Sequence, residues 1–560
     1  MRNSWRTITL ILFFGILYSL LFFNAYKLQI IKGDYYLSLA HALDTAGGIL
    51  EAKRGNVYFT DKNNNSSPAA INKSFPVIYA VPTEIQKNAE QGRESMQSYA
   101  EKLNSALKVA IEDLEKKLTK KDDQYELLVQ KAAAEEVAQV RDLNLKGVYI
   151  KNQVLRYYPL GDLAAHVLGF VSPVNENESA KLGNAEVGRY GVELYFDDSL
   201  SGEPGEIKGD RLIEPEKGGD IRLTIDREIQ AQSEEILKKL VNEYKASGGT
   251  VIIEEPKTGK ILAMASFPNF DPNNYSQSKI ENFLNPAVEA VYEPGSILKV
   301  VTMAAGIDSG KITPETTYYD TGFFTANNKT ISNWDYKTHG PYGKATMTNV
   351  LEHSINTGAV FAERKTGHDV FYNYLTKFGM NELTGITLPG EVKGSIANLK
   401  KGKDIDFATA AYGQGISITP VRLISAISAI ANNGILMRPY ILANKEPQSI
   451  RRVIAESTAK TVTQMMVSAV DKNKVAAISG YSVAGKTGTA FVPLFGQKGY
   501  SDEVINTYVG FAPASDAKFI ILIKLDKPAG APVAALTVVP SFQKLAQFIL
   551  NYYNIAPDRI

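Results

Sequence analysis

A serine and a lysine three residues apart, Ser296 and Lys299, have the types and the spacing of a nucleophile with its base. They lie in YEPGSILK, where Pro294 precedes an apolar run and Gly310 follows it, so a helix is predicted over residues 297–308. The first turn of a helix favours developing negative charge, and a three-residue step brings both side chains to one face. Lysine acts as a base only where burial or a neighbouring cation keeps it partly neutral. Alone the pair is a weak signal, because a chain of this length contains such matches by chance.

A second candidate group is Ser354-Ile355-Asn356 in the segment HSINTG. A second serine can relay a proton to a leaving amine, and the asparagine Asn356 can both donate to and accept from the amide backbone of a peptide substrate. Serine and asparagine this close together more often start a helix or form a turn. The tripeptide therefore gains meaning only beside the other groups.

A third group consists of Lys486, Thr487, Gly488 and Thr489 in the apolar run YSVAGKTGTAFV, which predicts a strand. Glycine in a strand lets a substrate backbone approach, and lysine with hydroxyl groups can hold a carboxylate. The backbone N–H of Thr489 can pair with that of Ser296 to form an oxyanion hole. This group is predicted to bind the substrate.

The tripeptide Lys-Thr-Gly occurs twice more, at residues 257–259 and 365–367. The first of these copies lies in a predicted hairpin turn and the second at the end of a predicted helix. Neither context presents a lysine along a strand. The copy at 486–488 is therefore the candidate.

The segments that must position these groups indicate one α+β domain over residues 216–560 with an antiparallel sheet. TVIIEEPKTGKILAMAS predicts a hairpin, and TYVGFAPAS followed by KFIILIKLDKP predicts another near the C-terminus. Helical periods run over residues 297–308, 348–364 and 421–432 between them. Strands at both ends and helices in the middle are typical of a sheet covered by helices. A boundary is predicted in the Gly-, Pro- and charge-rich stretch at 203–220.

The N-terminal part predicts a membrane anchor over residues 7–26, because this uncharged run fits a helix across about 30 Å of hydrocarbon. Residues 1–6 are then a cytoplasmic tail, although the flanking charges do not determine orientation. A cleavable signal peptide is disfavoured, since no A-x-A-like exit follows the run. Residues 33–215 predict an irregular pedestal domain. Helical spacing over 84–145 predicts exposed helices with solvated faces rather than a dedicated docking surface.

Composition excludes several classes of function. The 560 residues are 44% hydrophobic, which allows a large core. Lys and Arg number 61 and Asp and Glu 60, so a net charge of +1 gives no field directed at nucleic acid. The chain has no Cys, and its 5 His show no His-Glu-x-x-His spacing. No metal, no cofactor and no nucleic acid partner are predicted.

Ser-x-x-Lys, Ser-x-Asn and Lys-Thr-Gly in this order match the motif set of the penicillin-binding proteins and class A β-lactamases. The chain resembles the class B penicillin-binding proteins, monofunctional and of high molecular weight, of the FtsI type or the elongation type. The phrases RYYPLGDLAAHVLGF, GRYGVELYFDDSLSGEPG, LTIDREIQ and YGQGISITPVRL are similar to that family's. One departure follows Arg54-Gly55, where the family continues toward Asp-Arg-Asn-Gly and this chain does not.

The resemblance implies an anchor, a pedestal or dimerisation-type domain, and a penicillin-binding transpeptidase domain with the serine β-lactamase-like fold. It implies a serine-type DD-transpeptidase whose substrate is the D-Ala-D-Ala end of a peptidoglycan stem peptide. Ser296 would be acylated with Lys299 as its base, and Ser354 and Asn356 would relay a proton and clamp the substrate. Lys486, Thr487, Gly488 and Thr489 would bind the substrate carboxylate.

The resemblance also implies binding of penicillin and other β-lactams, a SEDS-type glycan polymerase as partner, and a catalytic body outside the cytoplasmic membrane. A catalytically weak or inactive scaffold is the alternative from another class. A β-lactamase would be shorter and released, and a β-lactam sensor would carry several membrane spans. Septal and elongation roles share these motifs, and the general layout leans only weakly toward a septal role.

Overall fold

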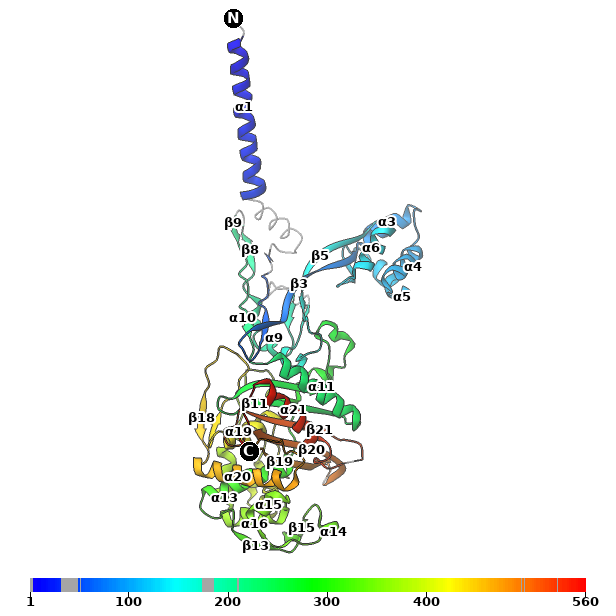
Figure 1. The fold of residues 1–560 in the computed structure, drawn as a ribbon. Helices are drawn as coiled ribbons and strands as arrows, with labels where there is room; N and C mark the ends of the chain where they lie inside the picture. Colours follow the sequence, from blue (N-terminus) through cyan, green and yellow to red (C-terminus); the bar gives the residue numbers. More distant parts are fainter. Residues whose placement is uncertain are drawn as a thin grey trace. The chain divides into compact units, whose positions relative to one another are not determined.

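The computed structural model describes residues 4–31, 49–50, 52–173, 186–208, 211–494, 496–497, 499–530 and 532–559. Residues 70–159 form one compact unit, and the remainder of the chain forms a second (Figure 1). Residues 1–3 of the predicted tail and the predicted start of the pedestal at Gly33 lie outside the described residues.

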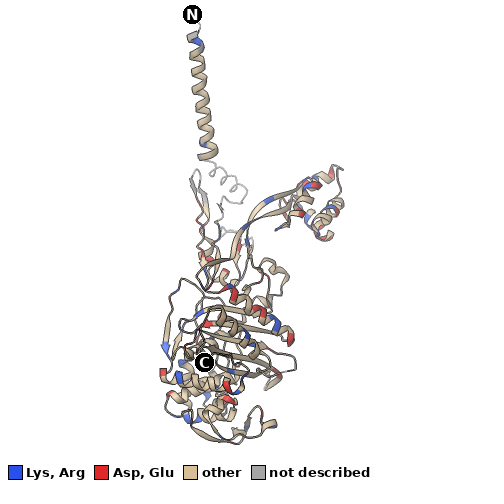
Figure 2. Ribbon diagram, viewed as in Figure 1, with Lys and Arg blue, Asp and Glu red and all other residues tan. Residues whose placement is uncertain are grey.

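The N-terminal run forms helix α1 (Ser4–Tyr26), which continues into the short π-helix η1 (Lys27–Ile31). Its stretch Ile8–Ile30 is long and apolar enough to cross a membrane, at about 34 Å for 23 residues. Figure 2 shows charged residues only near the ends of this helix. The sequence predicted this apolar helix, and the structure extends it by a few residues at each end.

The unit of residues 70–159 packs helices on an antiparallel ribbon. Strand β3 (Ser66–Ala80) enters this unit and pairs with β5 (Val148–Tyr157) from Ile71↔Tyr157 to Ala80↔Val148, and β4 (Glu126–Val129) pairs with the end of β3. The helices are α3 (Pro82–Glu90), α4 (Met96–Leu107), α5 (Ile111–Leu118) and α6 (Ala134–Leu143). Tyr99, Leu103 and Leu114 are fully buried between them. The predicted helices over 84–145 therefore form. Each of them buries one face in a hydrophobic core that the four helices share.

Several short elements of the other unit precede its main sheet. They are β1 (Ile49–Leu50), β2 (Val57–Thr60), β6 (Val171–Pro173), β7 (Glu186–Gly188), β8 (Gly205–Lys208), β9 (Arg211–Ile213), β10 (Ile221–Arg222), α7 (Ala165–Leu168), α9 (Gly191–Tyr195) and α10 (Asp197–Ser201). Arg54 forms ion pairs with residues far away in the sequence, because its guanidinium lies 2.7 Å from the carboxylates of both Glu193 and Asp197. Burial opposes the charge of Arg54, but these two carboxylates raise its pKa.

The main sheet has the order β12-β11-β21-β20-β19, with antiparallel neighbours throughout. Its strands are β11 (Gly248–Glu255), β12 (Lys260–Phe267), β19 (Ala484–Pro493), β20 (Tyr500–Ala512) and β21 (Phe519–Asp526). Both predicted hairpins are confirmed, as β11 with β12 and β20 with β21. The first connects through the Lys-Thr-Gly copy at 257–259.

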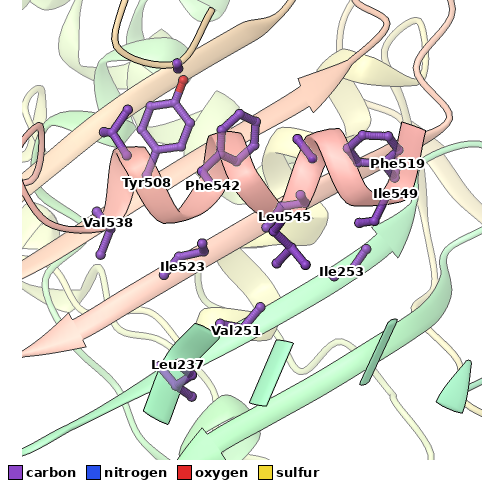
Figure 3. Packing of buried hydrophobic residues seen from close by; sticks show 14 of the residues in the cluster. Leu237, Val251, Ile253, Tyr508, Phe519, Ile523, Val538, Phe542, Leu545 and Ile549 are labelled. Carbon is purple, nitrogen blue, oxygen red and sulfur yellow. The ribbon is translucent and has the colours of Figure 1, made fainter. Parts of the chain in front are cut away.

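Helices cover both faces of this sheet. On one face, α11 (Arg227–Glu243) and α21 (Val538–Tyr552) bury side chains such as Leu237 and Phe542 against Val251 and Ile523 (Figure 3). On the other face lie α19 (Pro420–Ala431) and α20 (Glu456–Asn473), and Ser425 of α19 donates to Glu254 of β11. Burial on both faces explains why the central strands are nearly continuous apolar runs.

The helices between the strands carry or flank the Ser-x-x-Lys and Ser-x-Asn motifs, while Lys-Thr-Gly lies on β19. They are α13 (Leu298–Asp308), entered through the 3₁₀ turn η4 (Gly295–Ile297), then α15 (Met347–Glu352), α16 (Asn356–Thr366), α17 (His368–Lys377) and α18 (Asp404–Ala410). The segment of helical period over 348–364 forms two helices, α15 and α16, and not a single one. The backbone of Ser354 has φ +55°, a left-handed conformation that ends α15 before α16 begins.

The remaining short elements are η2 (Pro272–Gln277), η3 (Ile280–Phe283), α12 (Pro286–Glu289), β13 (Thr317–Asp320), β14 (Phe323–Ala326), β15 (Lys329–Ser332), α14 (Tyr336–His339), β16 (Gly343–Thr346), η5 (Ala397–Lys401), β17 (Ile435–Met437) and β18 (Ser449–Arg452). β13 pairs with β16, β14 with β15, and β17 with β18. The first two of these ribbons lie between α13 and α15 in the sequence.

Candidate active site

The turn that carries Ser296 lies against strand β19. A Cβ atom on Gly488 would stand 2.8 Å from the carbonyl oxygen of Pro294, and one on Gly295 would stand 3.2 Å from that of Thr489. Gly295 also has φ +55°, which favours glycine. Both glycines therefore permit a backbone approach that larger residues would prevent. This approach brings the Lys-Thr-Gly strand beside the predicted nucleophile.

Lys299 is fully buried one turn beyond Ser296. Its Nζ donates to the Ser354 carbonyl, to Ser354 Oγ at 3.2 Å and to Asn356 Oδ1 at 2.8 Å. Within the described part of the chain, these groups rather than the Ser296 hydroxyl are the hydrogen-bond partners of the Lys299 amine. The structure thus joins the Ser-x-x-Lys and Ser-x-Asn groups through the lysine.

Lys486 reaches the same serine from the strand. Its Nζ lies 2.9 Å from Ser354 Oγ, 3.1 Å from the Thr487 carbonyl and 3.3 Å from Thr487 Oγ1. Its residue is only 3% exposed. Ser354 Oγ is therefore held between two buried amines, one from α13 and one from β19.

Burial makes both amines weakly basic. Burial lowers the pKa of Lys299 well below its usual range, and the charge of Lys486 lowers it further while Asp335 opposes the shift. Burial alone lowers the pKa of Lys486 to about 7. A neutral amine is therefore available near neutral pH, which is the condition that a lysine base requires.

Thr487 and Thr489 lie on the more open face of β19. Along this strand Lys486, Gly488 and Ala490 are buried, whereas Thr487 is half-buried and Thr489 exposed. Alternation along a strand puts the two hydroxyls on one face. The site therefore offers two hydroxyl groups beside a buried amine, a combination suited to an anionic group of a substrate.

A buried aspartate supports the Ser-x-Asn loop, and sequence reasoning did not find it. Asp320 accepts from Thr357 Oγ1 at 2.5 Å, from Asn333 Nδ2 at 3.0 Å and from the Tyr342 N–H at 2.8 Å. Thr357 follows Asn356 directly. No signal in the sequence could have identified Asp320, because its partners come from three separate segments.

The segment after α18 holds the turn that carries Ser296 from another side. The Gly295 N–H donates to the Gly413 carbonyl at 3.0 Å, and Thr302 Oγ1 donates to the Ala411 carbonyl at 2.7 Å. The Gly415 N–H donates to Glu293 Oε1 at 2.9 Å, and burial raises the pKa of Glu293 to about 7. The phrase YGQG at 412–415 is thus part of the site's framework.

A serine on a turn against a strand, two buried lysine amines that share a second serine, and hydroxyl groups along that strand are the groups that a serine acyltransferase uses. Residues 249–541 match the family model of the penicillin-binding protein transpeptidase domain, and residues 49–236 match that of the penicillin-binding protein dimerisation domain. The chain belongs to the penicillin-binding protein transpeptidase family, and the combination of these two domains is that of a class B member. The fold is α+β, as predicted.

Relatives match over most of the chain. Stage V sporulation protein D of Bacillus subtilis is 30% identical over 90% of this chain and 78% of its own length. Peptidoglycan D,D-transpeptidase FtsI of Escherichia coli is 28% identical over 95% and 89%. The crystal structure of penicillin-binding protein 3 from Mycobacterium tuberculosis, complexed with aztreonam, superposes with a TM-score of 0.68 at 25% identity, covering 91% of this chain and 98% of that one.

Proposed function

We propose that this chain is a peptidoglycan D,D-transpeptidase that works through an acyl-enzyme on Ser296. The observation that carries the proposal is the position of Ser354 Oγ between the amines of Lys299 and Lys486, next to the turn that carries Ser296. The relatives named as peptidoglycan D,D-transpeptidases support the same reaction.

In the acylation step, the neutral amine of Lys299 takes the proton of Ser296 Oγ as this oxygen attacks the carbonyl of the penultimate D-Ala. The backbone N–H groups of Ser296 and Thr489 stabilise the developing oxyanion. Ser354 passes a proton to the departing amine of the terminal D-Ala and receives one from Lys299 or Lys486. The amine of a second stem peptide then attacks the ester, forms the cross-link and frees Ser296.

The substrate is held from both sides in this proposal. Asn356 contacts the amide backbone of the stem peptide, while Lys486, Thr487 and Thr489 bind its terminal carboxylate and Gly488 admits its backbone. A β-lactam would follow the same route, its ring opening on Ser296. The complex of the relative with aztreonam supports this extension.

We also infer the arrangement at the membrane. Residues 1–6 lie in the cytoplasm, 7–26 cross the membrane, 33–215 form the pedestal and 216–560 the transpeptidase domain, with the body on the outer side where nascent peptidoglycan is found. The apolar helix supports a single-pass anchor. A SEDS-type polymerase is the proposed partner, since the family lacks a glycosyltransferase of its own. The scaffold alternative is not favoured, because all three motifs are present and meet at one site.

The experiment uses the full chain in detergent, incubated with a fluorescent penicillin and analysed by intact mass and peptide mapping. One adduct per chain on Ser296, lost in Ser296→Ala and kept in Ser309→Ala, is expected. Ser309 lies at the other end of α13 and is the matched control. Absence of any adduct from folded wild-type protein, or an adduct on another residue, would contradict the assignment.

A further inference from the structure

A histidine outside the catalytic group links two of the elements that form it. His368 opens α17, and its Nδ1 lies 2.6 Å from Glu363 Oε1 of α16 while its Nε2 lies 3.2 Å from Asp404 Oδ1 of α18. Its ring also stacks on that of Phe407, with centroids 4.1 Å apart and planes at 11°. The imidazole therefore bridges α16 and α18 with a fixed orientation.

Each of the two bridged helices has one end at the active site, α16 its first residue and α18 its last. Helix α16 begins with Asn356, and Glu363 stands about two turns further along the same helix. Helix α18 runs directly into the segment whose carbonyls at Ala411 and Gly413 accept from Thr302 and Gly295. A change in the spacing of α16 and α18 would therefore change the position of Asn356 relative to the turn that carries Ser296.

Two hydrogen bonds from the His368 ring to the carboxylates of Glu363 and Asp404 require one proton more than a neutral imidazole supplies. A neutral imidazole has one N–H, yet both ring nitrogens face carboxylate oxygens, so either the ring is doubly protonated or Glu363 carries the second proton. Glu363 is fully buried, and within the described ranges its Oε2 has no hydrogen-bond partner. An ionised Glu363 is costly at such a position unless a cation pairs with it.

The pKa shifts agree with this geometry. Burial opposes protonation of His368, but the hydrogen bonds with Glu363 and Asp404 raise its pKa above the usual value. Burial raises the pKa of Glu363 against the hydrogen bond from His368. Because both pKa values are raised, the pair of His368 and Glu363 keeps its additional proton to higher pH than either group would alone in water.

Other charged groups also face this bridge, and solvent reaches it. Asp369 is on the same helix, Arg364 is on α16 and acts on Glu363, and Lys400 of η5 lines the same surface hollow as His368. The hollow has a volume of about 720 Å³, and the His368 side chain is 31% exposed. The ring can therefore exchange its proton with bulk water.

We propose that His368 is a positioning residue whose additional proton holds α16 against α18 and so keeps Asn356 in place for acylation of Ser296. A group with a raised folded-state pKa contributes fully below its unfolded value and loses the contribution as pH rises through its folded value. The support is therefore complete in mildly acidic solution and lost as pH rises above about 6.5. This inference rests on the proposed function, because acylation is its readout.

The test measures the second-order rate constant of acylation by a fluorescent penicillin from pH 5.5 to 9, using the full chain in detergent. Wild type is compared with His368→Gln, which cannot carry the proton, and with His368→Arg, whose planar cation can stack on Phe407 and donate to both carboxylates at every pH. Asp369→Asn is the matched control, since it removes a charge beside the bridge without touching it. Melting temperatures at each pH identify unfolded variants.

At pH 6, His368→Gln is expected to acylate about threefold to tenfold more slowly than wild type, the difference closing toward pH 9. His368→Arg should retain the wild-type rate at pH 6 without the loss at higher pH, and Asp369→Asn should follow wild type. A folded His368→Gln protein with an unchanged pH profile would overturn the proposal. If that variant does not fold, Asp404→Asn replaces it and must show a smaller loss of the same sign. Failure of wild type to acylate at any pH would instead contradict the proposed function.

Discussion

The same tripeptide, Lys-Thr-Gly, occupies two very different places in this protein. At 257–259 it forms the turn between β11 and β12, where the Lys257 side chain is 52% exposed and pairs with Asp516 at 2.5 Å. At 486–488 it lies within β19, where Lys486 is 3% exposed and its pKa falls to about 7 because of burial. Identical residues thus give a solvated cation in one place and a weakly basic amine in the other.

The glycines of the two copies differ as well. Gly259 has φ +82°, which the turn requires, whereas Gly488 has an ordinary strand conformation and is needed because Pro294 approaches its backbone. The chemistry of the tripeptide therefore depends on what packs against it. Variants of the two copies test this difference.

The largest effect is expected where the buried site loses its base. Lys299→Met should lower the acylation rate constant by about 10²- to 10⁴-fold, because general base catalysis typically contributes that much. The measurement is stopped-flow or gel-based acylation by a fluorescent penicillin. A loss below tenfold in folded protein would transfer the base role from Lys299 to Lys486.

A smaller effect is expected from crowding the backbone approach. Gly488→Ala would bring a methyl group to 2.8 Å from the Pro294 carbonyl and displace the turn that carries Ser296. Misplacement by about 1 Å costs about 10²-fold in rate. Gly259→Ala is the matched change in the other copy, where a Cβ would meet the Arg438 carbonyl at 2.4 Å. It should lower the melting temperature and leave acylation of the folded fraction unchanged.

The smallest effects on rate are expected from removing the lysine of either Lys-Thr-Gly copy. Lys486→Met should slow acylation by about tenfold to a hundredfold, in keeping with the loss of hydrogen bonds from a charged group. It should also move the acid limb of the pH profile to higher pH, because the charge of Lys486 lowers the pKa of Lys299 and its removal lets that pKa rise. Measuring the acylation rate constant as a function of pH checks both the slower rate and the shift of the acid limb.

Lys257→Met is the control for this change. It removes an exposed ion pair, and such pairs contribute at most about 1 kcal/mol to stability. Its acylation rate and pH profile should match wild type. If Lys257→Met and Lys486→Met gave the same profile, burial would not distinguish the two copies.

Local patterns predicted much of the fold. Both hairpins of the main sheet form, as do helices over 298–308 and 420–431, because periodicity within a segment determines which face it buries. The choice of the third Lys-Thr-Gly copy also followed from its apolar flanks. The tendency of Ser354 and Asn356 to form a turn or start a helix agrees with the start of α16 at Asn356, whereas the helical period over 348–364 gave no sign of the left-handed Ser354.

The contacts inside the site were harder to predict. Helical spacing predicted Lys299 on the face of Ser296, but it could not predict the hydrogen bonds that tertiary packing gives its amine with Ser354 and Asn356. Asp320 and His368 could not be found, because each acquires its role from segments far away in the sequence. Distances between elements depend on the whole core and not on any one motif.

The ribbon of β3 and β5 has a consequence for how this chain can vary in evolution. Ile71 and Tyr157 are register partners, so the unit of residues 70–159 begins and ends on adjacent strands, about 5 Å apart. A tight connection could replace the whole unit without altering the chain on either side. Insertions, deletions or exchange for another module are therefore tolerated best here, and this part of the gene can diverge while the residues that surround Ser296 remain constrained.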